Sequence, residues 1–316
     1  MSLSPLLSAQ SLSRYYGSQL AVDNVSFDVF KGEVLGFLGP NGAGKSTSMK
    51  MLSGNLAPSQ GQITINDYDL FSHPKQAKAH IGYLPEQPPL YKELSVIEFL
   101  SFCAKVNRID ITQRKQAIDT AVERCGLSDV RKRLIGHLSK GYQQRLGIAQ
   151  AIIHTPAVII LDEPTSGLDP IQIRDIRQLI REIAREHSVI LSTHILPEVQ
   201  MLCDRVQIIN HGRMVYSGST EQLSQHMQTS RLLINLKQPP SRHELEQLEH
   251  ITTVEQINDT CFRLHFLPDN DPTACLLSTA ISQQWQLTEL IPEHHSLEDV
   301  FMNIIQQESE LTRKTN

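Results

Sequence analysis

The chain has 316 residues, of which 40% are hydrophobic and 20% charged, and its formal net charge at pH 7 is −5. The length is enough for two domains, and the negative charge argues against non-specific nucleic-acid binding, which needs clustered lysine and arginine. No window approaches the roughly 20 consecutive apolar residues of a membrane-spanning helix, no signal peptide opens the chain, and five scattered cysteines are typical of a reducing compartment, so we expect a cytosolic location.

The first predicted elements are short alternating apolar runs in residues 6–30, which are typical of an antiparallel hairpin or meander. Tyr16 stands just before Gly17 near the first turn. This aromatic ring could stack on an adenine or could cover a strand edge. The stretch by itself does not decide between the two.

A phosphate-binding loop follows, because Gly39, Gly44, Lys45 and Ser46 match the pattern G-x-x-x-x-G-K-[ST]. The apolar run before the loop predicts a short buried strand, and residues 47–52 predict the start of a helix. Backbone N–H groups of such a loop point at phosphate oxygens, and the helix N-terminus adds its positive dipole end. We expect Lys45 to reach the β- and γ-phosphates and Ser46 to bind Mg²⁺. The other loop residues expected to bind the nucleotide are Pro40, Asn41, Gly42, Ala43 and Thr47.

The next segment predicts a strand at 62–66, a helix at 74–80 and a strand at 81–85 that ends at Glu86 and Gln87. Gln87 could bind Mg²⁺ or the attacking water, or it could be a solvated loop residue. Apolar residues at helical spacing then predict a helical insertion over about residues 90–150. Ser139 is well placed to cap the helix that runs to Ala151, and its free N–H groups could also meet an anion. From these residues alone, simple capping is the preferred interpretation.

Two further strands end on polar side chains. The apolar run from Ala157 predicts a strand buried on both faces that presents Asp162 and Glu163 at its end. Asp162 suits a Mg²⁺ ligand, and Glu163 suits a base that polarises the attacking water. After a helix over 171–186, the strand 188–194 ends on His194, which could sense the γ-phosphate or could be structural. Residues 204–218 predict a hairpin with a His-Gly turn.

The pattern changes near residue 228. Strands are predicted at 232–236, 252–257, 262–267 and 287–291, helices at 243–248 and 273–283, and a final helix from Ser296. This βαββαβ order predicts a small ferredoxin-like module. Because it contains neither a glycine nor a phosphate motif, we expect it to regulate, dimerise or dock.

Six motifs together resemble the ATP-binding subunit of ABC transporters over about residues 6–222. They are Walker A (Gly39–Thr47), the Q-loop glutamine (Gln87), the signature (Leu138–Arg145), Walker B (Val158–Glu163), the D-loop (Ser166–Asp169) and the switch histidine (His194). The resemblance implies an α/β fold with a P-loop NTPase core, a β-layer and a helical insertion in residues 1–227. Residues 228–316 form the α+β ferredoxin-like module.

The resemblance also implies a head-to-tail dimer of two copies, with ATP held between the Walker motifs of one copy and the signature of the other. Ser139 and Gly141 then approach the γ-phosphate, Asp169 contributes from the D-loop, and Tyr16 matches the adenine-stacking aromatic. The signature departs from Leu-Ser-Gly-Gly-Gln at Lys140 and Tyr142. Any role of the missing glutamine side chain is therefore in doubt.

These features predict a Mg²⁺-dependent ATPase that powers a separate transmembrane permease from the cytoplasmic face of the inner membrane. The Leu-Ser-Lys-Gly-Tyr signature and the C-terminal Ser-Leu-Glu-Asp-Val-Phe resemble a bacterial exporter branch. An alternative is a soluble ABC-type ATPase of translation or DNA repair, against which a single Walker A motif, missing heptads and acidic charge argue. A third hypothesis is a regulatory protein that hardly hydrolyses ATP, which the intact Glu163 and His194 disfavour.

Overall fold

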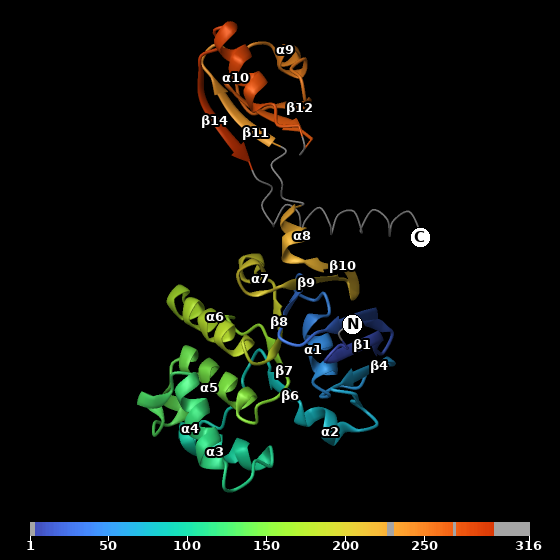
Figure 1. Cartoon of the computed structure of the whole chain (residues 1–316), viewed down its shortest axis with the longest axis vertical. Helices are drawn as coiled ribbons and strands as arrows, with labels where there is room; N and C mark the ends of the chain where they lie inside the picture. Colours follow the sequence, from blue (N-terminus) through green and yellow to red (C-terminus); the bar gives the residue numbers. More distant parts are fainter. Residues whose placement is uncertain (1–3, 226–230, 268–269, 294–316) are drawn as a thin grey trace. The chain divides into compact units, whose positions relative to one another are not determined.

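A computed structural model describes residues 4–225, 231–267 and 270–293 (Figure 1). The chain divides into two compact units, Met1–Thr220 and Glu221–Asn316. The boundary predicted from the sequence lies a little later, after residue 227. The difference concerns helix α8 (Thr220–Gln225), most of which is grouped with the second unit. The helix expected from Ser296 lies outside the described residues.

A six-stranded sheet forms the centre of the first unit, with the strand order β10-β9-β3-β8-β7-β6. The strands are β3 (Val34–Leu38), β6 (Ile81–Leu84), β7 (Val158–Asp162), β8 (Ser188–Thr193), β9 (Arg205–Asn210) and β10 (Arg213–Ser219). All but β10 run parallel, and every residue of β3, β7 and β8 is buried. Parallel strands covered on both faces need such uninterrupted apolar sequences.

The register of the parallel strands brings their carboxyl ends to one edge of the sheet. Leu38 pairs with Thr193, and Asp162 pairs with Ser192. The loops that follow β3, β7 and β8 therefore start side by side. In open α/β sheets this edge is where ligands bind.

A second, antiparallel sheet supplies the predicted β-layer. It has the order β2-β1-β4-β5 and consists of β1 (Leu7–Tyr16), β2 (Gln19–Val29), β4 (Gln60–Ile65) and β5 (Tyr68–Asp69). Leu12 of β1, Met49 of helix α1 (Lys45–Leu52) and Ile160 of β7 belong to one buried apolar cluster. The two sheets and α1 therefore share a core, which fixes the helix that follows the phosphate loop.

The remaining helices of the first unit include the predicted insertion. They are α2 (Pro74–Ala79), α3 (Val96–Val106), α4 (Arg114–Arg124), α5 (Lys140–Ile152), α6 (Pro170–Ala184) and α7 (Leu196–Leu202), with 3₁₀ turns at Ser128–Val130 and Ile135–His137. Ser95 and Glu98 form a capping box at the start of α3. Within the expected helical insertion, α3 and α4 are separate helices, and Arg108 between them has a left-handed φ of 59°. No helix in the described residues is long and apolar enough to span a membrane.

The second unit has the predicted βαββαβ order. Its elements are β11 (Arg231–Leu236), α9 (Arg242–Glu246), β12 (Ile251–Gln256), β13 (Cys261–Phe266), α10 (Thr273–Ser282) and β14 (Leu287–Glu293). The antiparallel sheet has the order β12-β13-β11-β14, so β13 lies between β11 and β12. That arrangement is the split βαβ motif of ferredoxin-like folds. Trp285, the chain's single tryptophan, is buried in a core that also holds Leu264.

The separate cores predict that the two units unfold independently. Leu264→Ala should lower the urea midpoint of the Trp285 fluorescence transition, since removing buried methyl groups costs about 2 to 5 kcal/mol. Ile160→Ala should lower the midpoint seen by far-UV circular dichroism and leave the fluorescence midpoint unchanged. If Ile160→Ala moves both midpoints equally, the chain unfolds as one cooperative unit.

Candidate functional site

The loop after β3 wraps around the ammonium group of Lys45. Lys45 Nζ donates to the carbonyl oxygens of Gly39 at 2.8 Å and Pro40 at 3.2 Å, and it lies 3.4 Å from Glu163 Oε1. The side chain is buried. A buried ammonium needs such oxygen partners, because desolvation strongly disfavours an unpaired charge. The loop therefore holds a positive charge at the edge of the sheet.

Gly44 is required at the end of this loop for two reasons. Its φ is 105°, in a region that only glycine adopts without strain. A Cβ built on it would also lie 2.6 Å from the Ala21 carbonyl oxygen of β2. The loop can therefore turn into α1 under the β-layer only with glycine at this position.

Asp162 and Ser46 meet beside the loop. Ser46 Oγ donates to Asp162 Oδ1 at 3.3 Å. Burial raises the pKa of the Asp162 carboxyl above its usual range, and the Ser46 hydroxyl and the Lys45 ammonium partly oppose this rise. A hydroxyl and a carboxylate are the oxygen ligands that Mg²⁺ prefers. The pair therefore fits a magnesium site, although the described residues contain no cluster of three acidic, histidine or cysteine side chains.

The Glu163 carboxylate lies between Lys45 of the phosphate loop and His194 and contacts both. Its Oε2 lies 2.8 Å from His194 Nδ1, while Oε1 faces Lys45. Since a carboxylate accepts, Nδ1 carries the proton in this contact. The Glu163 backbone has a left-handed φ of 48°, which costs about 1 to 2 kcal/mol for a residue with a Cβ. Strain of this kind gathers at functional sites.

Apart from Asp162, which lies behind Ser46, these groups line a cavity of about 390 Å³. Eight residues expected from the sequence line it: Asn41, Gly42, Gly44, Lys45, Ser46, Thr47, Glu163 and His194. Ala21, Glu86 and Ser166 line it as well. Ser166 belongs to the predicted D-loop, but no motif pointed to Ala21 or Glu86, whose positions depend on how β2 and the chain after β6 fold around the edge of the sheet.

Several expected residues stand outside this lining. Gln87 is exposed, and its neighbour Glu86 faces the cavity instead. Tyr16 is 46% exposed at the end of β1, where the Arg14 guanidinium lies 5.2 Å from its ring centroid. Gly39 and Pro40 act through their carbonyl groups, and Ala43 accepts a backbone hydrogen bond from Gly212.

The signature segment lies at a different cavity, of about 230 Å³, lined by Ser139, Gly141 and Gln172 among others. Ser139 Oγ caps α5 by accepting from the Tyr142 N–H, as the sequence predicts. Asp169 caps α6 by accepting from the Gln172 N–H at 2.9 Å.

The signature residues Lys140 and Gly141 both lie against other segments of the same chain. Lys140 Nζ lies over Gly167 on the side where a Cβ would project, and Gly141 packs on the Gln172 side chain. Because Gly167 has no Cβ, the D-loop leaves room for the lysine. Lys140 of the signature therefore lies against the D-loop of the same chain.

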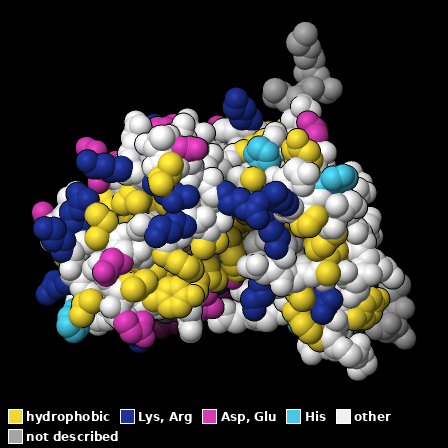
Figure 2. Space-filling view, turned by 90° about the horizontal axis from the view of Figure 1, so that it is seen from below, with side chains coloured by type: hydrophobic (Ala, Val, Ile, Leu, Met, Phe, Trp, Pro, Cys, Tyr) yellow, Lys and Arg dark blue, Asp and Glu magenta, His cyan; other side chains and the backbone are white. Residues whose placement is uncertain are grey.

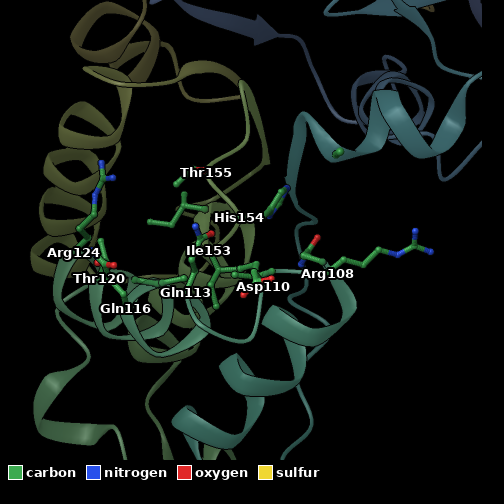
Figure 3. Close-up of a pocket in the computed structure, with 15 residues that line it drawn as sticks. Arg108, Asp110, Gln113, Gln116, Thr120, Arg124, Ile153, His154 and Thr155 are labelled. Carbon is green, nitrogen blue, oxygen red and sulfur yellow. The ribbon is translucent and has the colours of Figure 1, made fainter.

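Another cavity, of about 550 Å³, lies along one face of α4, against the end of α5 and the chain after α3 (Figure 3). Arg108, Asp110, Gln113 and His154 line it. Burial lowers the pKa of His154, whose Nε2 lies 2.9 Å from the Ile81 carbonyl oxygen. None of the residues that line this cavity lines the cavity at the phosphate loop.

Comparison with known proteins decides the family. The sequence profile of the ABC transporter family matches residues 22–166. The chain is 34% identical over 300 residues to the uncharacterized ABC transporter ATP-binding protein YxlF of Bacillus subtilis, covering 95% of this chain and 99% of YxlF. The chain belongs to the ABC transporter ATP-binding proteins. The resemblance seen in the motifs is thus confirmed, and the protein is an ATPase subunit of a transport system.

Other members of this family show the same relationship. The bacitracin transport ATP-binding protein BcrA of Bacillus licheniformis is 42% identical over 215 residues, covering 67% of this chain and 69% of BcrA. A solved ATP-binding subunit of an ABC transporter matches with a TM-score of 0.64 and 32% identity, over 70% of this chain and 92% of that subunit. CbiO1 of Clostridium perfringens, part of the complex cbiONQ, gives 0.63 and 29%, over 69% and 90%. The predicted P-loop NTPase fold is confirmed.

The left-handed backbone at Glu163 predicts an inverted preference between glycine and alanine. Glu163→Gly should be more stable than Glu163→Ala by about 1 kcal/mol, because glycine alone adopts this φ without strain. At the preceding strand residue, Asp162→Gly should be less stable than Asp162→Ala by a similar amount. Urea unfolding followed by circular dichroism measures both pairs. The same order at both positions would contradict the strained backbone at Glu163.

Proposed function

We propose that the ATPase site is the cavity at the phosphate loop, and that Mg-ATP closes a head-to-tail dimer to power export through a transmembrane permease. The observation that carries this proposal is the convergence of Lys45, the Ser46–Asp162 pair and the Glu163–His194 pair at one edge of the sheet. Phosphoryl transfer needs positioning and charge neutralisation, and these groups supply both. Nucleotide chemistry is thereby assigned to residues 1–227.

Lys45 and the N–H groups of the loop hold the β- and γ-phosphates, and Ser46 with Asp162 holds Mg²⁺. The metal supplies charge neutralisation at the phosphate oxygens. Gln87 acts from the loop beside Glu86, at the metal or the attacking water. Tyr16 stacks on the adenine, which requires Arg14 to share or leave its ring.

Glu163 orients the water that attacks the γ-phosphate. Without nucleotide, its carboxylate is held by Lys45 and His194. When phosphates draw Lys45 away, one carboxylate oxygen becomes available to accept a proton from water, while His194 keeps the other oxygen in place. His194 then contacts the γ-phosphate from its exposed position at the end of β8.

A second copy of the chain completes the site. Within one chain, Ser139 and Gly141 line a different cavity from the phosphate loop. Ser139 and Gly141 of one copy bind the γ-phosphate on the other, with Asp169 and its D-loop between the copies. Each copy carries both half-sites, which favours two identical subunits.

Export from the cytoplasmic side is the transport function that fits best. The relatives include BcrA, which is named for bacitracin transport, and LnrL of Bacillus subtilis, named for linearmycin resistance. These names favour transport over the alternative in translation or DNA repair. The subunit works on the cytoplasmic face of the inner membrane without nucleic acid, and residues 228–316 serve as an accessory module for regulation, dimerisation or docking.

The permease docks on the exposed aromatic surface of the helical insertion. Tyr91 and Phe102 are exposed and meet edge to face, with ring centroids 5.6 Å apart. Val106 lies one turn further along α3 and is also exposed. Figure 2, which views the end where α3 lies in Figure 1, shows hydrophobic side chains exposed together beside lysine and arginine. Aromatic residues with arginine are typical of binding hot spots.

Substitution of Glu163 tests the proposed catalysis. Glu163→Gln should bind ATP and accumulate as a closed dimer while hydrolysis falls at least about 100-fold, because the amide cannot accept the proton from water. Lys45→Ala should lose nucleotide binding. Phosphate release, ATP binding and size-exclusion chromatography with Mg-ATP measure these effects. Wild-type turnover in Glu163→Gln would remove Glu163 from this role.

Substitution of the aromatic surface tests the proposed docking. Phe102→Asp should reduce the permease that co-purifies with tagged protein from solubilised membranes at least about tenfold, because truncating a hot-spot aromatic costs about 2 kcal/mol or more and tenfold corresponds to about 1.4 kcal/mol. Phe71→Asp, at an exposed phenylalanine outside the insertion, is the matched control. Mass spectrometry identifies and quantifies the permease. Equal recovery with both variants would contradict docking at this surface.

A further inference from the structure

A fully buried carboxylate lies directly behind the His194 loop. Glu198 Oε2 accepts from Thr193 Oγ1 at 2.8 Å, and Glu198 Oε1 accepts from Arg177 Nη2 at 3.2 Å. Glu198 and Thr193 have no exposed surface. Thr193 Oγ1 in turn accepts from the Ile195 N–H at 3.0 Å. The three side chains therefore form a chain of contacts that ends on the peptide unit after His194.

The network is costly to bury, which argues that it does more than pack. Removing a carboxylate from water carries a large penalty that a single ion pair often fails to offset. Arg177 Nε is also buried without a hydrogen-bond partner among the described residues. Apolar side chains of similar volume could fill this space at no loss of stability. The hydrogen bonds of the network set the direction in which the chain leaves β8, which apolar side chains could not do.

We propose that Glu198 and Arg177 are positioning residues that hold His194 against Glu163 through the Thr193 hydroxyl. Thr193 is the last residue of β8, and His194 Nδ1 reaches Glu163 Oε2 immediately beyond it. Arg177 comes from α6, the helix that Asp169 of the D-loop caps. A shift of the D-loop helix therefore reaches His194 through Arg177, Glu198 and Thr193. This inference rests on the proposed role of the Glu163–His194 pair in hydrolysis.

The decisive variants change one hydroxyl. Thr193→Val keeps the shape of the side chain and removes the donor to Glu198 and the acceptor for Ile195. Thr193→Ser keeps the hydroxyl and removes a methyl group. We expect kcat for ATP hydrolysis to fall about 10- to 100-fold in Thr193→Val, because small displacements of a catalytic group cost that much, with KM for ATP within about twofold. Thr193→Ser should keep at least about half of the wild-type kcat.

A double-mutant cycle separates positioning from general destabilisation. If the network acts through His194, adding Thr193→Val to His194→Ala should lower kcat no further. Glu33→Gln is the matched control, since it weakens another partly buried ion pair, in which Glu33 lies 3.2 Å from Arg205. Glu33 lies just before β3, at the amino ends of the strands, away from His194. This control should keep wild-type kcat even if its melting temperature falls.

Each outcome decides the proposal. A Thr193→Val protein with wild-type kcat would overturn the proposal. A double variant whose loss of kcat is the product of the losses in Thr193→Val and in His194→Ala would also overturn it. An equal loss in Glu33→Gln would assign the effect to stability and would also overturn it. A wild-type protein without ATPase activity would first refute the proposed function. The inference alone fails if the wild type is active and the hydroxyl variants are equivalent.

Discussion

The site depends on the register of three parallel strands. Because Leu38 pairs with Thr193 and Asp162 pairs with Ser192, the phosphate loop, the carboxylates and His194 leave the sheet side by side. A slip of one residue would turn every side chain of a strand to the other face. The buried apolar runs of β3, β7 and β8 hold this register, so packing in the core fixes the positions of the polar side chains at the edge.

Buried charged side chains then determine which ligands this edge of the sheet can bind. Lys45, Asp162 and Glu163 are all buried, and each is partnered by loop carbonyls, a hydroxyl or another charge. A single buried charge is unfavourable, but opposite buried charges attract each other strongly. Both effects arise because a low dielectric raises the desolvation cost of a charge and the attraction between charges. In the function proposed above, the charged phosphates and Mg²⁺ take over the partners that these groups now find in one another.

The proposed nucleotide site and the proposed docking surface lie on different parts of the chain. The helical insertion exposes aromatic residues, and the second unit has its own sheet and core. Surfaces outside the strand edge that we propose to hold the phosphates can vary in sequence, because substitutions there do not disturb the register of the strands.

The sequence by itself determined the fold class, the order of elements and the identity of the motifs. These depend on local signals: apolar runs, the cap at Ser139, and a loop whose glycines and lysine have few other uses. The structure alone decided that Glu86 rather than Gln87 lines the cavity, that Lys140 lies over Gly167, and that Glu198 supports His194. Those contacts join residues from different elements, and their geometry follows from packing, which no local pattern encodes.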